Sequence, residues 1–192
     1  MAVAGLQPAD SGRGQIDQQR LLVEAARARD EAAWSQLFDD NFHSLYVYAL
    51  TRVHNHHAAE EIAAQVFEEA IRGIKKFQYR GAPLRAWMFR IAHNVSADYL
   101  ARHKRRGEEE LFESEASIDE LREAGVRVDF LRGLDLLTEE QRQVVVLRFV
   151  NDLSVEETAS VIGKSEGAVK MAQARGLQKL REEMADYKGV PE

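Results

Sequence analysis

Residues 83–106 have the sequence PLRAWMFRIAHNVSADYLARHKRR. Apolar side chains recur in it at the spacing of one helix face, and they are Leu84, Trp87, Met88, Ile91, Val95 and Tyr99. Its one proline, Pro83, stands at the start, where the first turn of a helix tolerates proline. The spacing therefore predicts a single helix over residues 83–106, roughly 36 Å long at 1.5 Å per residue.

A second face of this predicted helix is polar and carries Arg90, His93, Asn94 and the small Ala97. The segment before it, FQYRGA at residues 77–82, combines aromatic rings, a cation and a glycine. Single-stranded bases stack on aromatic rings and on arginine planes. The loop and this helix face could therefore contact nucleic acid. The equally weighted alternative is that Phe77 and Tyr79 cover the edge of the core.

Helical spacing of apolar residues continues through the rest of the chain, and strand-like alternation is absent. We expect further helices over residues 17–28, 30–55, 57–74, 138–150, 154–163 and 165–185. Thr138–Gln141 and Ser154–Glu157 have the capping-box pattern that marks a helix start, and Asp30 is a predicted N-cap. The prediction is an all-α fold of two small helical domains joined by a flexible acidic linker. In chain order we expect a flexible N-terminal tail (1–16), the first domain (17–106), the linker (107–127), the second domain (128–186) and a short tail (187–192).

Charge is unevenly distributed along the chain. The net charge of −6 argues against a general nucleic-acid binder, because DNA affinity depends largely on neutralising phosphates. Residues 83–106 nevertheless carry six Arg and Lys side chains against one acid, whereas residues 107–123 carry eight acids against one arginine. This segregation suggests separate surfaces with separate partners. The plainer alternative is a solvated helix end followed by a solvated linker.

Composition excludes several classes of function. With no cysteine, the chain has no disulfide, no thiolate metal site and no cysteine nucleophile. It has no apolar run near the roughly 20 residues that span a bilayer, and its first residues lack the pattern of a signal peptide. We therefore expect a cytoplasmic protein without membrane insertion. His43, His54, His56 and His57 fall around a predicted helix junction where side chains diverge, so no metal site is expected. No phosphate loop or nucleophile motif is present, and no enzyme is expected.

Residues 154–180 have a helix-turn-helix pattern, with the turn at Gly163-Lys164. The second helix has a predicted buried stripe of Val169, Ala172, Gly176 and Leu180. Its opposite face carries Gly167, Lys170, Met171, Ala174 and Arg175. In a major groove, Lys and Arg reach guanine acceptors and apolar groups meet thymine methyls, while the helix start at Ser165 suits a phosphate. The alternative is an ordinary helical hairpin with a polar outer face.

Together these segments resemble the extracytoplasmic-function (ECF) group of the sigma-70 family. The resemblance rests on LYVYAL (45–50), AAEEIAAQVF (58–67), RAWMFRIAHN (85–94), LTEEQR (137–142) and LSVEE (153–157), and it covers residues 17–106 and 128–185. It implies a bacterial alternative sigma factor that binds core RNA polymerase and directs promoter-specific transcription initiation. Sigma region 2 would span residues 17–106 and region 4 would span 128–186. A different helix-turn-helix regulator is the alternative, but it would leave the polar face around Asn94 and its aromatic loop unexplained.

The resemblance also implies partners and site residues. The partners would be promoter DNA, the clamp helices of the largest polymerase subunit, the flap of the second-largest subunit and, in many such proteins, an anti-sigma factor. No cofactor is expected, because the polymerase supplies the catalytic magnesium. Contacts to the minus-ten region would come from Phe77, Tyr79, Arg80, Arg90, His93, Asn94, Arg102, Arg105 and Arg106. Contacts to the minus-thirty-five region would come from Ser165, Gly167, Lys170, Met171, Ala174 and Arg175, and contacts to core polymerase from Glu61, Gln65 and Glu68. The chain departs from the usual family pattern at Ala58, Ala64 and Met171-Ala172.

Overall fold

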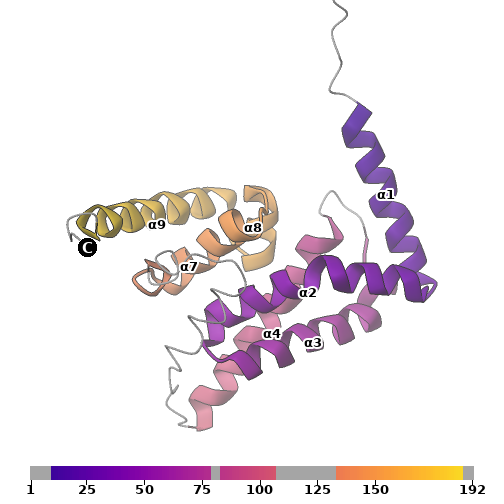
Figure 1. Cartoon of the computed structure of the whole chain (residues 1–192), viewed down its shortest axis with the longest axis horizontal. Coiled ribbons are helices and arrows are strands. Elements are labelled where there is room, and N and C mark those ends of the chain that lie inside the picture. Colours follow the sequence, from indigo (N-terminus) through magenta and orange to yellow (C-terminus); the bar gives the residue numbers. More distant parts are fainter. Residues whose placement is uncertain (1–9, 79–82, 107–132, 188–192) are drawn as a thin grey trace, which may run out of the picture.

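The computed structural model describes residues 10–78, 83–106 and 133–187, and every regular element within these ranges is helical (Figure 1). The elements, in chain order, are α1 (Asp10–Arg27), α2 (Glu31–Val53), α3 (His56–Gly73), the 3-10 turn η1 (Ile74–Lys76), α4 (Leu84–Arg106), α7 (Glu139–Val145), the π-helical segment η2 (Val146–Val150), α8 (Val155–Ile162) and α9 (Glu166–Tyr187). This confirms the predicted all-α fold. The predicted acidic linker, residues 107–127, lies outside the described residues.

Local capping signals determine where several helices begin and end. Asp30 accepts a hydrogen bond from the Ala33 backbone N–H at 2.8 Å, as an N-cap does. Thr138 and Ser154 both form complete capping boxes with the residues three positions later. Gly163 closes α8 in the left-handed conformation, with φ of 67°. These starts and stops confirm the predicted caps.

Two helix boundaries differ from the prediction. Helix α1 begins at Asp10, inside the stretch expected to be a tail. Once a helix exists, each further residue adds one hydrogen bond, so two glycines near its start did not prevent its extension. The helix predicted over 138–150 changes to a π-helical segment at Val146, where the Asn151 backbone N–H donates to the Val146 carbonyl at 3.0 Å. The Asn151 side chain also donates to that carbonyl, at 3.3 Å, and supports the wider turn.

The first domain is built on α2, α3 and α4, with α1 packed against α2 (Figure 1). Its core includes the fully buried side chains of Tyr48, Leu50, Met88 and Phe89. Helix α4 packs on α2 and α3 and also on α8 of the second domain. For that reason Phe89, which lies outside the predicted apolar stripe, is as buried as Met88.

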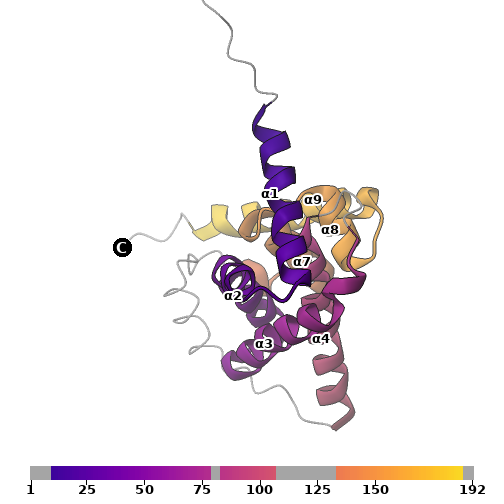
Figure 2. The ribbon, with the colours of Figure 1, turned by 90° about the vertical axis from the view of Figure 1, so that its right-hand side faces the viewer.

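The second domain comprises α7, η2, α8 and α9. A small core of Val144, Ala159, Val169 and Ala172 joins α7, α8 and α9. A second and larger buried cluster runs without interruption from the first domain into α7, η2 and α8. The two domains therefore pack on one another, and two views show the second domain on one side of the first (Figures 1 and 2). The sequence did not predict this contact.

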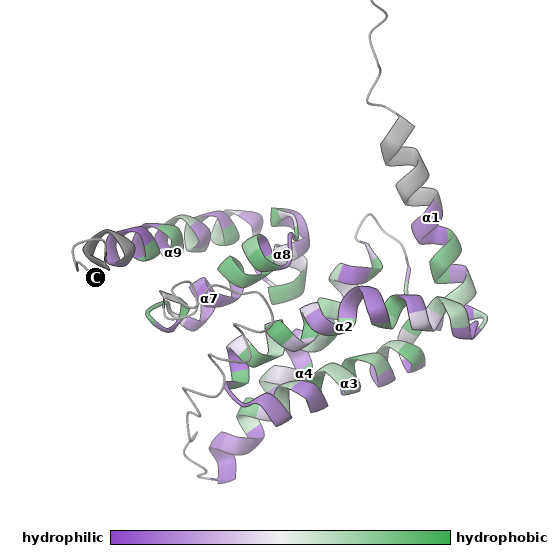
Figure 3. Ribbon diagram, in the orientation of Figure 1, coloured by the Kyte–Doolittle hydropathy of each residue, from purple (hydrophilic) through white to green (hydrophobic). Residues whose placement is uncertain are grey.

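The C-terminal end of α4 is hydrophilic, whereas α8 combines hydrophobic and hydrophilic residues (Figure 3). Among the helices described, none combines the length and apolar character that a membrane span requires.

Candidate nucleic-acid interface

Helix α4 exposes a polar face and a strongly cationic end. Arg90 and Asn94 are exposed, and their spacing of four residues places them on the same side of the helix. The predicted minus-ten residues Arg102, Arg105 and Arg106 are exposed as well, in the last turns of α4. Cations at this end also complement the negative end of the helix dipole. The helix thus offers anion-binding side chains to solvent.

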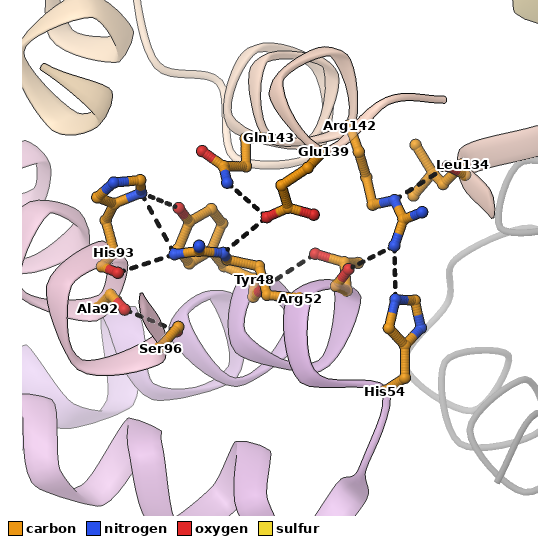
Figure 4. A network of polar contacts seen from close by, with 11 residues as sticks. Tyr48, Arg52, His54, Ala92, His93, Ser96, Leu134, Glu139, Arg142 and Gln143 are labelled. Atoms are coloured by element: carbon orange, nitrogen blue, oxygen red, sulfur yellow. Dashed lines mark hydrogen bonds and ion pairs between the residues drawn. The ribbon is translucent and has the colours of Figure 1, made fainter. Parts of the chain in front are cut away.

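His93 belongs to the predicted minus-ten face, but its ring is half-buried and makes polar contacts within the protein (Figure 4). Its Nδ1 lies 3.1 Å from the Tyr48 hydroxyl and 3.3 Å from Nη1 of Arg52. Burial and the neighbouring Arg52 cation lower the pKa of His93 to about 4, although Glu139 acts in the opposite direction. Burial likewise raises the pKa of Tyr48 to about 12. In this arrangement the Nδ1 of His93 accepts from Arg52, and the ring faces Tyr48 and Arg52 of α2.

The loop before α4 is only partly described, because Tyr79 and Arg80 lie outside the described residues. Phe77 is 6% exposed, and its ring lies 5.1 Å from that of Trp87. Its carbonyl accepts a hydrogen bond from the Arg27 guanidinium. The position of Phe77 thus agrees with the alternative that it covers the core edge.

Helix α9 has the two distinct faces that the sequence pattern predicts. Val169, Ala172 and Leu180 are buried. A Cβ on Gly176 would lie 3.1 Å from Val145, so this glycine permits close approach of α9 to α7. The predicted minus-thirty-five residues form the outer side, and Ser165, Gly167, Lys170, Met171, Ala174 and Arg175 are all exposed.

Two features of the outer face of α9 are suited to DNA. The Ser165 hydroxyl accepts a hydrogen bond from the Ala168 N–H at 3.2 Å and so caps the helix start. Met171 is 56% exposed, which leaves its apolar side chain free to meet thymine methyl groups. The one ion pair described on this face joins Lys170 to Glu166 at 3.4 Å, and both side chains are exposed, so the pair is weak.

Helix α3 exposes the three predicted polymerase-contact residues, Glu61, Gln65 and Glu68. Each is held by a neighbour on the same helix: Glu61 lies 3.3 Å from His57, Gln65 donates to Glu69 at 3.0 Å, and Glu68 accepts from Arg72 at 2.9 Å. Of the two departures from the family pattern on this helix, Ala58 is buried and Ala64 is exposed. The departure at Ala64 is therefore the one that changes the surface.

An exposed apolar patch beside this helix was not predicted. Phe38 stacks on Phe42 with ring centroids 4.6 Å apart and lies 5.1 Å from Phe67. Phe38 and Ile71 remain 45% and 44% exposed. The sequence contains a signal for this patch, because Phe38 and Phe42 are one helical turn apart, as are Phe67 and Ile71. We call Phe38, Phe42, Phe67 and Ile71 the aromatic patch.

The histidines do not gather around a common point. His54 faces Arg142, His56 hydrogen-bonds the Tyr46 hydroxyl at 2.8 Å, and His57 faces Glu61. Within residues 10–78, 83–106 and 133–187, no group of three or more metal-ligating side chains could hold an ion.

Comparison with known proteins agrees with these features. The family model "Sigma-70 region 2" matches residues 37–106, and "Sigma-70, region 4" matches residues 133–182. The chain is 34% identical over 172 residues to the ECF RNA polymerase sigma factor BldN of Streptomyces coelicolor, a match that covers 86% of this chain and 65% of BldN. It is 29% identical over 137 residues to the ECF RNA polymerase sigma factor SigD of Mycobacterium tuberculosis, a match that covers 66% of this chain and 63% of SigD. The chain thus spans a little under two thirds of the length of these relatives.

The solved structure of CnrH in complex with the cytosolic domain of CnrY shares the fold. It superposes with a TM-score of 0.68 at 24% identity, covering 88% of this chain and 97% of CnrH. The motifs, the two family models and the curated relatives lead to one assignment: the chain belongs to the sigma-70 family, in its extracytoplasmic-function group.

Proposed function

We propose that this chain is an alternative sigma factor, which binds core RNA polymerase and directs promoter-specific initiation of transcription. The observation that carries the proposal is the presence of two separate exposed faces suited to DNA. Helix α4 exposes Arg90 and Asn94 ahead of a cationic end, and α9 exposes Lys170 and Arg175 in a helix-turn-helix. The curated relatives are themselves named RNA polymerase sigma factors.

Each face has a distinct role in this proposal. Asn94 reads a base at the upstream edge of the minus-ten element, while Arg90 and the basic end of α4 hold nearby backbone or base edges. The outer face of α9 reads the minus-thirty-five element through hydrogen bonds from Lys170 and Arg175 and apolar contacts from Met171. Because Phe77 is buried, Tyr79 and Arg80 are the better candidates for capturing a flipped base.

Polymerase docking is assigned to α3 and the aromatic patch next to it. Glu61, Gln65 and Glu68 supply a polar and acidic surface for the clamp helices, and the aromatic patch supplies apolar area that docking would bury. The whole chain is acidic, with a net charge of −6, so it gains little from general attraction to DNA. Holding both DNA-facing helices on the polymerase raises their effective concentration at the promoter. The chain itself performs no catalysis in this scheme and needs no cofactor.

An anti-sigma factor is a further proposed partner. CnrH was solved with the cytosolic domain of CnrY, and a sigma factor RpoE of Bartonella quintana was solved with the anti-sigma factor NepR. We extend this kind of partner to the present chain as part of the proposal.

Reconstituted transcription tests the proposed function. Core RNA polymerase is incubated with genomic DNA, with and without the chain, and RNA 5′ ends are mapped. We expect new start sites that appear only with the chain and share two upstream elements. If the chain added no start sites to those of core polymerase alone, the proposal would be wrong.

A further inference from the structure

The outer side of α9 presents a sulfur atom that solvent can reach. Met171 is 56% exposed, on the side of the helix that also exposes Lys170 and Arg175. Methionine is more often a buried residue. Met171 is also one of the positions at which this chain departs from the usual family pattern. The exposed thioether is therefore a feature of this chain and not of the family as a whole.

The residues around Met171 leave its side chain uncovered. A helical side chain leans toward the N-terminus of its helix and lies over the residues three and four positions earlier. For Met171 those residues are Ala168 and Gly167, which are the two smallest residue types. A Cβ on Gly167 would have the Ser165 hydroxyl as its nearest neighbour beyond the helix backbone, at 3.9 Å, so the space beside the thioether is open. A small molecule in solution can therefore reach the sulfur.

A second methionine has the opposite surroundings. Met88 is 1% exposed and lies in the core of the first domain. The chain has four methionines and no cysteine, so no thiol competes with the thioethers for an oxidant. Because an oxidant must reach the sulfur before it can react, Met171 should be oxidised well before Met88 in the folded chain.

We propose that Met171 is an oxidation site, at which a peroxide changes the base preference of α9. Hydrogen peroxide transfers one oxygen atom to the thioether sulfur as its O–O bond breaks, so that the methionine becomes the sulfoxide and the peroxide is reduced to water. In a methionine sulfoxide reductase two thiols reverse the step: the oxygen leaves as water and the thiols are oxidised to a disulfide. The oxidation site stands on the exposure of Met171, and only its effect on base preference rests on the proposed function.

Oxidation changes the chemistry that Met171 offers to a base. The thioether is apolar and suits the methyl group of thymine. A sulfoxide is polar, and contact with that methyl group would leave its oxygen without a hydrogen-bond partner. The amino groups of adenine and cytosine donate hydrogen bonds in the major groove and suit the sulfoxide instead. Loss of one methyl-sized apolar contact should by itself reduce the preference for thymine about fourfold.

Peptide mass spectrometry locates the oxidised sulfur. The folded chain is incubated with hydrogen peroxide, catalase removes the remaining oxidant, and the peptides that contain each methionine are compared. We expect Met171 to be converted to the sulfoxide while Met88 is oxidised only in chain unfolded by urea. Conversion of Met88 as fast as Met171 in the folded chain, or no conversion of Met171, would show that the proposed site is wrong.

Two substitutions separate oxidation of Met171 from oxidation elsewhere. Met171→Leu keeps an apolar side chain that peroxide does not oxidise, and Met171→Gln introduces a polar side chain of similar length, as the sulfoxide does. Leucine and glutamine are both good helix formers, so neither should disturb α9 at this exposed position. Each chain, with and without peroxide treatment, is added to untreated core polymerase on a promoter library randomised in the minus-thirty-five element.

We expect the oxidised parent and the untreated Met171→Gln variant to lose preference for thymine about fourfold at the same position of the element. Peroxide should not change the preference of Met171→Leu, and reductase treatment should restore that of the oxidised parent. An unchanged preference in the oxidised parent, or an equal loss in peroxide-treated Met171→Leu, would overturn the proposal. If no variant supported transcription although Met171 was oxidised as expected, the proposed function would be refuted and the oxidation site would stand.

Discussion

Replacing Phe89 with alanine tests how α4 is buried. Phe89 is 0% exposed, its ring meets Tyr48 edge-on at 5.6 Å, and the Arg85 guanidinium lies 5.5 Å from its centroid. Removing a buried phenylalanine costs about 3–5 kcal/mol of unfolding free energy through lost burial and the cavity left behind. For a chain of this length, about 4 kcal/mol corresponds to a fall of roughly 8–16 °C in Tm.

Urea denaturation followed by circular dichroism measures this cost. Phe149→Ala is the matched control, because Phe149 is 47% exposed and its truncation should cost only about 1–1.5 kcal/mol. Phe89→Leu, which keeps most of the buried volume, should recover a large part of the loss. If Phe89→Ala cost no more than Phe149→Ala, Phe89 would not be buried between α4 and its neighbours, and the packing described here would be wrong.

The remaining predictions concern pH, capping and base reading. The pKa of His93 is lowered from 6.5 to about 4 in the folded chain, so the unfolded chain binds a proton at this histidine at a higher pH than the folded chain does. The Tm should therefore decrease as the pH falls from about 6.5 to about 4. A His93→Gln variant should show a smaller decrease. Ser154→Ala removes the N-cap of α8 and should cost about 1 kcal/mol in urea denaturation, whereas Ser160→Ala on the same helix should cost much less. In transcription from a randomised promoter library, Lys170→Ala and Arg175→Ala should each reduce the preference for particular bases in the minus-thirty-five element by about 1–3 kcal/mol. Asn94→Ala should reduce base preference in the minus-ten element instead. Uniform loss of output across all sequences would argue against base reading by these side chains.

The sequence predicted those parts of the fold that depend on local signals. The caps at Asp30, Thr138, Ser154 and Gly163 act within one helical turn, so a short stretch of sequence contains all the information they need. The buried and exposed faces of α9 were predicted from the helical spacing of its apolar residues, which is also a local signal. Arg90, Asn94 and the outer residues of α9 are exposed, as predicted DNA-facing residues must be.

Features that depend on the contact between domains were not predicted. Arg52 and Glu139 are 87 residues apart and Arg142 and His54 are 88 apart, so no local pattern pairs them. The burial of Phe89 was not predicted, because a helix that is packed on several sides buries residues outside any single apolar stripe. The same packing turns the ring of His93 toward Arg52, whereas helix spacing alone placed it on an open polar face. Roles in binding polymerase and promoter DNA remain predictions.

Binding to a mapped promoter would show whether the chain needs core polymerase to recognise DNA. A fluorescent promoter fragment from the transcript mapping is titrated with the chain alone, with core polymerase alone and with both together. We expect the chain alone to bind weakly and without preference over a scrambled fragment, and the chain with core polymerase to form a heparin-resistant complex on the promoter only. Tight and sequence-specific binding by the chain alone, unchanged when core polymerase is added, would refute the dependence on core polymerase and indicate a helix-turn-helix regulator instead.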